Sequence, residues 1–296
     1  MFLNKSFVFN LYFPSRLRLI QTNDTSTADL SRFTSLKRLM CSTEKIIPPL
    51  SVWHFKLISQ NDEDPTTLSE PLYSPSVGAF TALYSLCLEN RIVSSPLSFH
   101  STSLYSLAFR QCRIACPLEN WTTLTFLKLT ECTFSPKSSF PTSLRCLSIV
   151  DCSDCPSNIP SLVQLTYLFY QQNQPHRVGS SDTPAVLDLT PLTQLQHVVL
   201  EVPFPVIFPS SLRCISVVPF SDFDLDFSAI PEIESLRMYD CQRLAFTPPP
   251  IIHQLVIENC PGVFPNLKHV QIDYLDINDD SLCLEKYPLT LKGFFN

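Results

Sequence analysis

Apolar residues recur along this chain in a fixed phrase, in which positions one, four and six are apolar and position nine is small and weakly polar. The phrase is clearest in the middle of the chain, where it begins at Leu104, Leu124, Leu144 and Leu165. The steps between these starts are 20, 20 and 21 residues. A fixed period of this size predicts a solenoid, in which each repeat buries its apolar face against its neighbours.

The same phrase continues towards both ends of the chain. Looser copies begin at Leu17, Leu36, Val52, Leu83, Leu195, Leu212, Ile233, Ile252 and Leu267. In the last copy the predicted apolar positions are Leu267, Val270 and Ile272. The preceding segment repeats as well, because residues 140–146 (FPTSLRC) are nearly copied as 208–214 (FPSSLRC). These flanking copies support the register independently of the apolar positions.

Each phrase contains the alternation of a β-strand. Because successive side chains of a strand point to opposite sides, we expect positions four and six to be buried and positions three, five and seven to face outward. The segments between phrases are rich in Pro, Ser and Thr, and prolines such as Pro136, Pro156 and Pro160 interrupt helices. With 26 Pro and 4 Gly in the chain, we expect extended, polyproline-like or short 3₁₀ segments there and few helices.

The phrase resembles the leucine-rich repeat, L-x-x-L-x-L-x-x-N/C-x-L. The residues at the Asn/Cys position are Cys112, Cys132, Cys152, Asn173, Cys241 and Cys260. The resemblance implies a leucine-rich repeat solenoid with a curved parallel β-sheet on a concave face and an irregular, helix-poor convex face. It covers residues 17–275, with insertions near 59–79 and 171–191. Residues 1–16 are then an N-terminal cap or truncated repeat, and residues 276–296 are the C-terminal end.

Composition and charge exclude several classes of partner. The net charge is −6, and Lys and Arg are not clustered as phosphate binding requires, so we expect no nucleic acid partner. No apolar stretch reaches the roughly 20 residues of a membrane-spanning helix, so we expect no membrane partner. Twelve Cys would suggest disulfides in a small secreted protein, but five of them lie in the inward column of the repeat. We therefore expect thiols and a cytoplasmic location, with secretion as the alternative.

One pair of cysteines is a candidate for metal binding or redox chemistry. Cys152 and Cys155 form a C-x-x-C motif, which is typical of half a zinc site or of a redox pair. The nearest similar pair, Cys112 and Cys116, lies two coils away, at roughly 10 Å given a strand spacing of about 5 Å, and ligands of one zinc ion must lie at about 2.3 Å from it. Packing within the repeat is therefore the favoured role of these cysteines.

The chain carries no recognisable catalytic constellation. Cys146 and His197 fall on the same predicted face, but no third residue orients the histidine. The motifs G-x-S-x-G and H-E-x-x-H and a Gly-rich phosphate loop are all missing from the sequence. We expect no enzymatic activity, no cofactor and no metal.

The concave face is the candidate partner-binding site. The outward positions selected there are Phe126, Lys128, Tyr167, Phe169, His197, Val199, Arg237 and Tyr239. Exposed aromatic side chains with a polar rim are typical of sites that bind proteins. The alternative is that the insertion near 171–191 folds over the aromatic residues and buries them.

Acidic residues outnumber basic residues on this predicted face from Glu89 onward, seven to three. The acids are Glu89, Glu131, Asp151, Glu201, Asp240, Glu258 and Asp273, and the bases are Arg110, Lys128 and Arg237. This balance favours a basic protein partner. The alternative is the solvated face of an acidic protein.

The sequence therefore predicts a non-catalytic protein–protein interaction module, a scaffold or adaptor that binds its partner on the concave face. One alternative is the substrate-recognition part of a larger assembly such as a ubiquitin ligase. Another is a secreted or surface recognition protein. The fold alone does not choose among these functions, and the sequence leaves the oligomeric state open.

Overall fold

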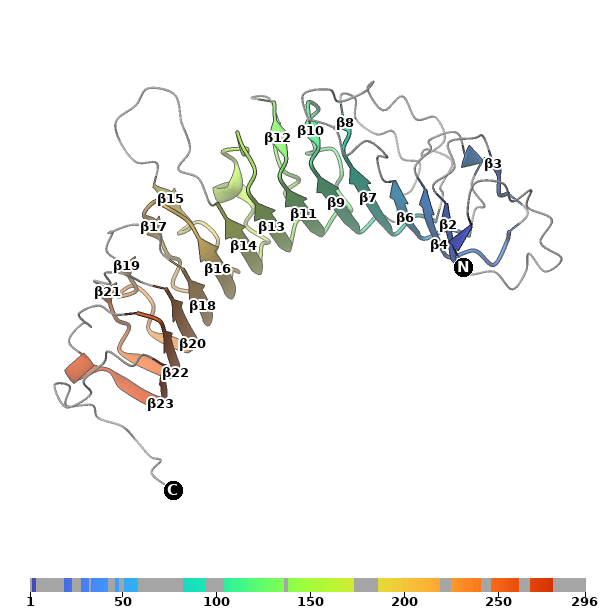
Figure 1. The fold of residues 1–296 in the computed structure, drawn as a ribbon. Helices are drawn as coiled ribbons and strands as arrows, with labels where there is room; N and C mark the ends of the chain where they lie inside the picture. Colours follow the sequence, from blue (N-terminus) through green and yellow to red (C-terminus); the bar gives the residue numbers. More distant parts are fainter. Residues whose placement is uncertain are drawn as a thin grey trace. The chain divides into compact units, whose positions relative to one another are not determined.

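The chain folds as a parallel β-solenoid of stacked coils with almost no helix (Figure 1). The computed structural model describes residues 2–3, 19–22, 28–31, 33–41, 46–47, 51–57, 82–93, 104–135, 138–172, 186–218, 225–240, 246–260 and 267–278. The coils form two compact units. Unit 1 comprises residues 1–144 and 152–157, and unit 2 comprises residues 145–151 and 158–296. The predicted solenoid of parallel strands with few helices is confirmed for the described residues.

Unit 1 is built on a main sheet of parallel strands. Their order is β1 (Phe2–Leu3), β2 (Leu19–Thr22), β4 (Arg38–Cys41), β6 (His54–Leu57), β7 (Ser85–Glu89), β9 (Ser106–Arg110) and β11 (Phe126–Thr130). Short strands of the same coils pair separately, as β8 (Ile92–Val93), β10 (Arg113–Ile114) and β12 (Thr133–Phe134) and as β3 (Ala28–Asp29) with β5 (Ile46–Ile47). In the coils that have both strands, the core includes buried residues of the long strand, such as Leu107, and of the short strand, such as Ile114.

Unit 2 repeats this plan. Its main sheet has the order β13 (Cys146–Val150), β14 (Tyr167–Gln171), β16 (His197–Glu201), β18 (Cys214–Val217), β20 (Glu232–Tyr239), β22 (Ile251–Glu258) and β23 (Gln271–Asn278). The short strands are β15 (Leu187–Asp188) with β17 (Val206–Ile207) and β19 (Leu225–Asp226) with β21 (Phe246–Thr247). The described helical turns are 3₁₀, at η4 (Ile159–Ser161) and η5 (Leu267–His269).

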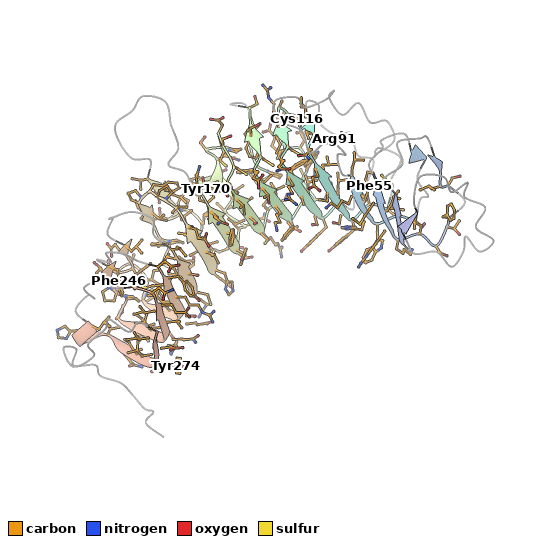
Figure 2. All side chains as sticks on the ribbon, in the orientation of Figure 1. Phe55, Arg91, Cys116, Tyr170, Phe246 and Tyr274 are labelled. Carbon is orange, nitrogen blue, oxygen red and sulfur yellow. The ribbon has the colours of Figure 1, made fainter. Side chains whose placement is uncertain are left out.

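The predicted register holds from the second copy of the phrase to the twelfth. The first residues of these phrases are all buried: Leu36, Val52, Leu83, Leu104, Leu124, Leu144, Leu165, Leu195, Leu212, Ile233 and Ile252. Leu17 lies outside the described residues, but Ile20 of the same phrase pairs with Leu39 as its frame requires. Stacking equivalent apolar residues of successive coils produces one continuous core in each unit, with Phe55 and Tyr170 among its aromatic members (Figure 2).

The prediction for the last phrase is wrong by five residues. Strand β23 pairs Ile272 with Ile252 and Leu275 with Leu255, so the phrase begins at Ile272 and not at Leu267. Leu267 and Val270 match the first two apolar positions of a phrase because they too are apolar, buried and three residues apart. They belong to the 3₁₀ turn η5, in which the Val270 N–H donates to the Leu267 carbonyl at 3.1 Å. Strand β23 ends at Asn278, beyond the predicted boundary at 275–276.

The cysteine column closes the ends of the long strands. The Sγ atoms of Cys112, Cys132 and Cys260 donate to the carbonyl two residues earlier, at 3.3, 3.3 and 3.2 Å. All three side chains are buried. A small apolar side chain with a weak donor suits this position, because it satisfies a strand-end carbonyl that faces away from water. Cys241 and Asn173, which were assigned to the same column, lie outside the described residues.

After several of the described long strands, the residue at position eight of the phrase is left-handed although it is not glycine. Positive φ values near 50° occur at Asn90, Gln111, Glu131, Asp151, Asp154, Asp240 and Asn259. Most of these are Asn or Asp, which tolerate this conformation better than other non-glycine residues. The scarcity of Gly in the chain is therefore compatible with sharp turns in these coils.

The copied flanking segments have a structural role. Phe140 and Phe208 are buried at equivalent places. Ser143 Oγ donates to the Leu124 carbonyl at 2.7 Å, and Ser211 Oγ donates to the Leu195 carbonyl at 2.8 Å. The repeated Ser thus joins each of these two coils to the preceding one, and the repeated Phe adds to its core.

Several predicted segments fall wholly or partly outside the described residues. These are the insertion near 59–79, residues 173–185 of the insertion near 171–191, residues 1–16 apart from β1, and residues 279–296. Within the described ranges, no helix has the length and apolar character that a membrane span requires.

Candidate recognition surface

One side of each main sheet is buried, and the other side carries positions three, five and seven of every phrase. We call this second side the open face. The alternation is regular, for example in β9, where Leu107 and Phe109 are buried and Ser106, Ala108 and Arg110 are not. Each strand is hydrogen-bonded to the next in register, so equivalent positions of neighbouring phrases lie side by side on the open face.

Four predicted partner-binding residues adjoin one another in unit 2. Tyr167 on β14 lies opposite His197 on β16, and Phe169 lies opposite Val199. Tyr167, Phe169 and Val199 are half-buried and His197 is exposed. Burial is also the main cause that raises the pKa of the Tyr167 hydroxyl, with the Cys146 thiol beside it as a second cause.

The other four predicted residues lie elsewhere. Arg237 and Tyr239 are on β20, which β18 separates from β16. Phe126 and Lys128 are on β11 in unit 1, where Phe126 is half-buried and Lys128 is exposed. The structure therefore brings together Tyr167, Phe169, His197 and Val199, and a single surface containing all eight residues stays a prediction.

The open faces of the two units carry opposite charge. In unit 1 the charged residues at positions three, five and seven are Arg38, Lys56, Arg110 and Lys128 against Glu89. In unit 2 they are Arg237 against Glu201, Glu258 and Asp276. The acidic balance counted over the whole face is thus a property of unit 2.

The cations of unit 1 surround a half-buried thiol. Glu89 pairs with Lys56 at 3.1 Å and with Arg110 at 3.4 Å. Cys87 lies between these strands, and burial raises the pKa of its thiol while Lys56 and the other nearby cations oppose the rise. The pKa of His54 is lowered, mainly by burial and then by the positive charges of Arg38 and Lys56. Both groups sit in a positive electrostatic field.

A second row of side chains borders the open face, and the sequence prediction missed it. It consists of position two of each phrase, and we call it the flank row. In unit 1 it contains Lys37, Trp53, Tyr84, Tyr105 and Thr125. The three aromatic residues are 45%, 42% and 43% exposed. Their rings form a continuous strip, with centroid separations of 6.2 Å for Trp53–Tyr84 and 5.0 Å for Tyr84–Tyr105.

A signal for this strip is present in the sequence. An aromatic residue follows the first apolar residue of three successive phrases, as Val52-Trp53, Leu83-Tyr84 and Leu104-Tyr105. Strand alternation assigns position two to the buried side, together with positions four and six. The position precedes the strand, however, and its carbonyl accepts the N–H groups of positions two and three of the next coil, as Tyr84 does for Tyr105 and Ser106 at 3.0 Å each. The side chain is consequently left at the surface.

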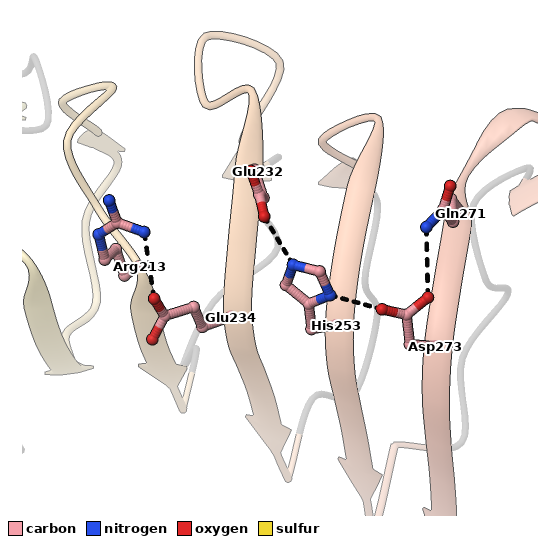
Figure 3. Close-up of polar contacts among 6 residues, drawn as sticks. All are labelled: Arg213, Glu232, Glu234, His253, Gln271 and Asp273. Carbon is pink, nitrogen blue, oxygen red and sulfur yellow. Dashed lines mark hydrogen bonds and ion pairs between the residues drawn. The ribbon is translucent and has the colours of Figure 1, made fainter.

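In unit 2 the flank row carries charges that pair with one another (Figure 3). Arg213 Nη1 lies 3.1 Å from Glu234 Oε1. His253 lies between two carboxylates, with Nε2 at 2.6 Å from Glu232 and Nδ1 at 2.5 Å from Asp273. Carboxylates only accept hydrogen bonds, so both ring nitrogens donate when the histidine is protonated. The hydrogen bonds to Glu232 and Asp273 accordingly raise the pKa of His253.

The Cys–His pair considered in the sequence is not adjacent in the structure. Tyr167 on β14 separates Cys146 from His197, and the thiol directly opposite His197 is Cys214. Burial raises the pKa of both the Cys146 and the Cys214 thiols, which disfavours the nucleophilic thiolate.

The buried cysteines of unit 1 contact one another along their column. The Cys132 N–H donates to Cys152 Sγ at 3.4 Å. The neighbouring thiols of Cys112 and Cys152 lower the pKa of Cys132, and the Cys132 thiol in turn raises the pKa of Cys112 and Cys152. Cys155 contacts Cys152 as well. Among the residues that the structure describes, no group of three or more His, Cys, Asp or Glu side chains is arranged to hold a metal ion.

Comparison with known proteins gives no further assignment. Neither a protein-family model nor a curated protein matches the sequence.

Proposed function

We propose that this chain is a leucine-rich repeat solenoid that acts as a non-catalytic protein-recognition scaffold, with its partner bound on the open face. The repeat phrase and the cysteine column support the family assignment, including a concave open face and a helix-poor convex side. The observation that carries the function is the exposed aromatic strip Trp53–Tyr84–Tyr105 at the edge of the open face of unit 1. Side chains of this kind supply most of the binding energy in protein interfaces.

The backbone beneath this strip supports a binding role. The N–H groups of Tyr84 and Tyr105 donate to the carbonyls of Trp53 and Tyr84 at 2.8 and 3.0 Å, so each ring is attached to a hydrogen-bonded coil. Such preorganised side chains lose little conformational entropy when a partner binds. Tyr167 and Phe169 of unit 2 are the second expected anchor, and the acidic balance there favours a basic partner surface.

The column of contacting thiols favours a reducing compartment, so we propose a cytoplasmic location. Its members Cys112, Cys132 and Cys152 hold thiols within contact distance in successive coils. Neighbouring thiols of this kind are retained where glutathione and thioredoxin keep cysteines reduced.

Affinity capture with matched variants tests the proposed function. The full chain is compared with a Phe126→Ser/Tyr167→Ser/Phe169→Ser variant and a Trp53→Thr/Tyr84→Thr/Tyr105→Thr variant, and each captured protein is then purified and titrated directly. The control replaces Val163, Val186 and Ile207 by Ser; these residues are also exposed but lie outside the strands of the main sheet.

A partner that the control binds and either open-face variant loses, with all variants folded by circular dichroism, supports recognition on the open face. Identical binding by all variants contradicts it.

A further inference from the structure

The aromatic strip and the cations of unit 1 belong to one surface. Trp53, Tyr84 and Tyr105 occupy position two directly before β6, β7 and β9. Lys56 and Arg110 are carried by two of these same strands, and Lys128 follows on β11. Position five of these strands runs in register from Lys56 through Cys87 and Ala108 to Lys128. An apolar edge thus borders a basic sheet face across neighbouring coils.

The basic character persists after the ion pairs within the surface are considered. One carboxylate, Glu89, contacts both Lys56 and Arg110. Arg38 and Lys128 are exposed on the same face, and Lys37 precedes Trp53 in the flank row. The net charge of these residues is therefore positive, which attracts carboxylates and repels a basic partner.

The ring geometry distinguishes between two classes of acidic partner. Tyr84 and Tyr105 stack on each other with an interplanar angle of 7°, and the Trp53 ring lies 6.2 Å from the Tyr84 ring with the two planes tilted by 44°. Nucleobases bind by stacking on an open ring face. Here the facing sides of Tyr84 and Tyr105 are occupied by each other, so this stacked pair presents ring edges to a partner. Apolar side chains pack on such edges, and a carboxylate accepts hydrogen bonds from tyrosine hydroxyls.

We propose that this surface of unit 1 binds an acidic protein segment that carries apolar side chains. The apolar residues pack on Trp53, Tyr84 and Tyr105, and the carboxylates face Arg38, Lys56, Arg110 and Lys128. This inference rests on the proposed function and specifies the partner chemistry for unit 1. The sequence favoured a basic partner, and the acids behind that preference belong mostly to unit 2.

A displayed library of random dodecapeptides provides the test. The full chain is immobilised, and enriched peptides are sequenced and titrated against the wild type and three variants. One variant is Trp53→Thr/Tyr84→Thr/Tyr105→Thr, which uses the residue that stands naturally at positions 125 and 166 of the flank row. The second is Arg38→Glu/Lys128→Glu. The matched control is Gln196→Thr/Arg213→Thr, in the flank row of unit 2.

We expect enriched peptides with net negative charge and several apolar residues. Their affinity should fall at least about tenfold in the aromatic variant. The Arg38→Glu/Lys128→Glu variant should also weaken binding, and more strongly at low salt than at high salt, because screening removes the repulsion. The matched control should bind like the wild type.

Protection of Cys87 gives a second readout that needs no variant at the binding residues. Its thiol is half-buried in the same row of the open face as Lys56 and Lys128, and its raised pKa means that alkylation is performed at alkaline pH. A bound peptide should slow alkylation of Cys87 and leave Cys214 of unit 2 unaffected. Both results can be obtained even if a variant fails to fold.

Three results would overturn the inference. Enriched peptides that are basic, or that bind the aromatic variant and leave Cys87 unprotected, remove unit 1 as the acidic-segment site but leave the recognition function intact. Enrichment of no peptide at all contradicts both proposals. Binding of a single-stranded oligothymidylate that the aromatic variant abolishes identifies a nucleic acid surface instead.

Discussion

The same backbone position is used differently in the two units. In unit 1 the flank row carries Trp53, Tyr84 and Tyr105, which contact one another and remain exposed. In unit 2 it carries Arg213, Glu234, His253 and Asp273, which form ion pairs across neighbouring coils. Among the described residues the open faces differ in the same way, with four bases against one acid in unit 1 and one base against three acids in unit 2.

This difference separates a structural role from a binding role. Charges that meet an opposite charge on the next coil are satisfied within the chain and contribute to stacking, although exposed pairs contribute little. Aromatic rings that stay exposed leave apolar area in contact with water, and such area is typical of surfaces that bind another protein. The repeat therefore fixes where position two lies, and the residue type decides what it does.

The largest expected effect concerns the independence of the two cores. Leu107→Ala in β9 and Leu236→Ala in β20 each remove a fully buried side chain and should destabilise the protein by about 2–5 kcal/mol. Because coils of a solenoid contact mainly their neighbours, hydrogen exchange should increase most in the unit that carries the substitution. Equal loss of protection in both units from either substitution would show a single cooperative structure.

A smaller effect is expected from the left-handed turns. Glu131 has φ of 52° and Asn259 has φ of 54°, but only Asn tolerates this region well. Glu131→Gly should stabilise unit 1 by roughly 1 kcal/mol, and Asn259→Gly should change unit 2 by less. Urea unfolding measures both.

Glu131 also accepts a hydrogen bond from Gln111 Nε2 at 2.7 Å, so Gln111→Ala serves as the control for its loss. An equal gain at both sites would mean that the strain does not depend on residue type.

Most of the fold was predictable because the repeat encodes it. The inward positions are strongly apolar, and a one-residue shift of the register would bury the charged open-face residues. The last phrase failed because local spacing was preferred over the period: Leu267 and Val270 mimic its first positions, whereas Ile272 lies 20 residues after Ile252. The period alone would have placed β23 correctly.

The candidate site was less predictable. Alternation correctly placed Tyr167 and Phe169 on the open face, but the predicted outward positions began at position three and so left out Trp53 and its neighbours at position two. The charge count also began at Glu89, which left out Arg38 and Lys56. The first omission has a physical origin, because exposure just before a strand depends on three-dimensional contacts that a one-dimensional pattern does not contain.

The charged flank row of unit 2 should give its stability a dependence on pH. The pKa of His253 is raised from 6.5 by Glu232 and Asp273. Its stabilisation is therefore full below about pH 6.5 and is lost as the pH rises through the raised folded-state value. The difference in the free energy of unfolding between the wild type and His253→Gln should therefore be larger at pH 5.5 than at pH 8.5. The gain should be no more than about 1 kcal/mol, because His253 and its two carboxylate partners are exposed.

Unfolding curves at the two pH values measure this difference, and Tyr84→Thr in unit 1 is the control, since its effect should not change with the protonation of His253. A His253→Gln effect that is the same at both pH values would remove the proposed role of the protonated ring.

The smallest effect tests the nature of the two flank rows directly. Double-mutant cycles of Tyr84→Thr with Tyr105→Thr and of Arg213→Thr with Glu234→Thr should each give a coupling of about 0.5 kcal/mol. The two coupling energies should differ in their dependence on salt concentration. The Arg213 and Glu234 side chains are 57% and 53% exposed, so 1 M salt should abolish their coupling, whereas the stacked rings should keep theirs. Salt-sensitive coupling in both rows would mean that the aromatic strip is held by its surrounding charges and is not an apolar contact in its own right.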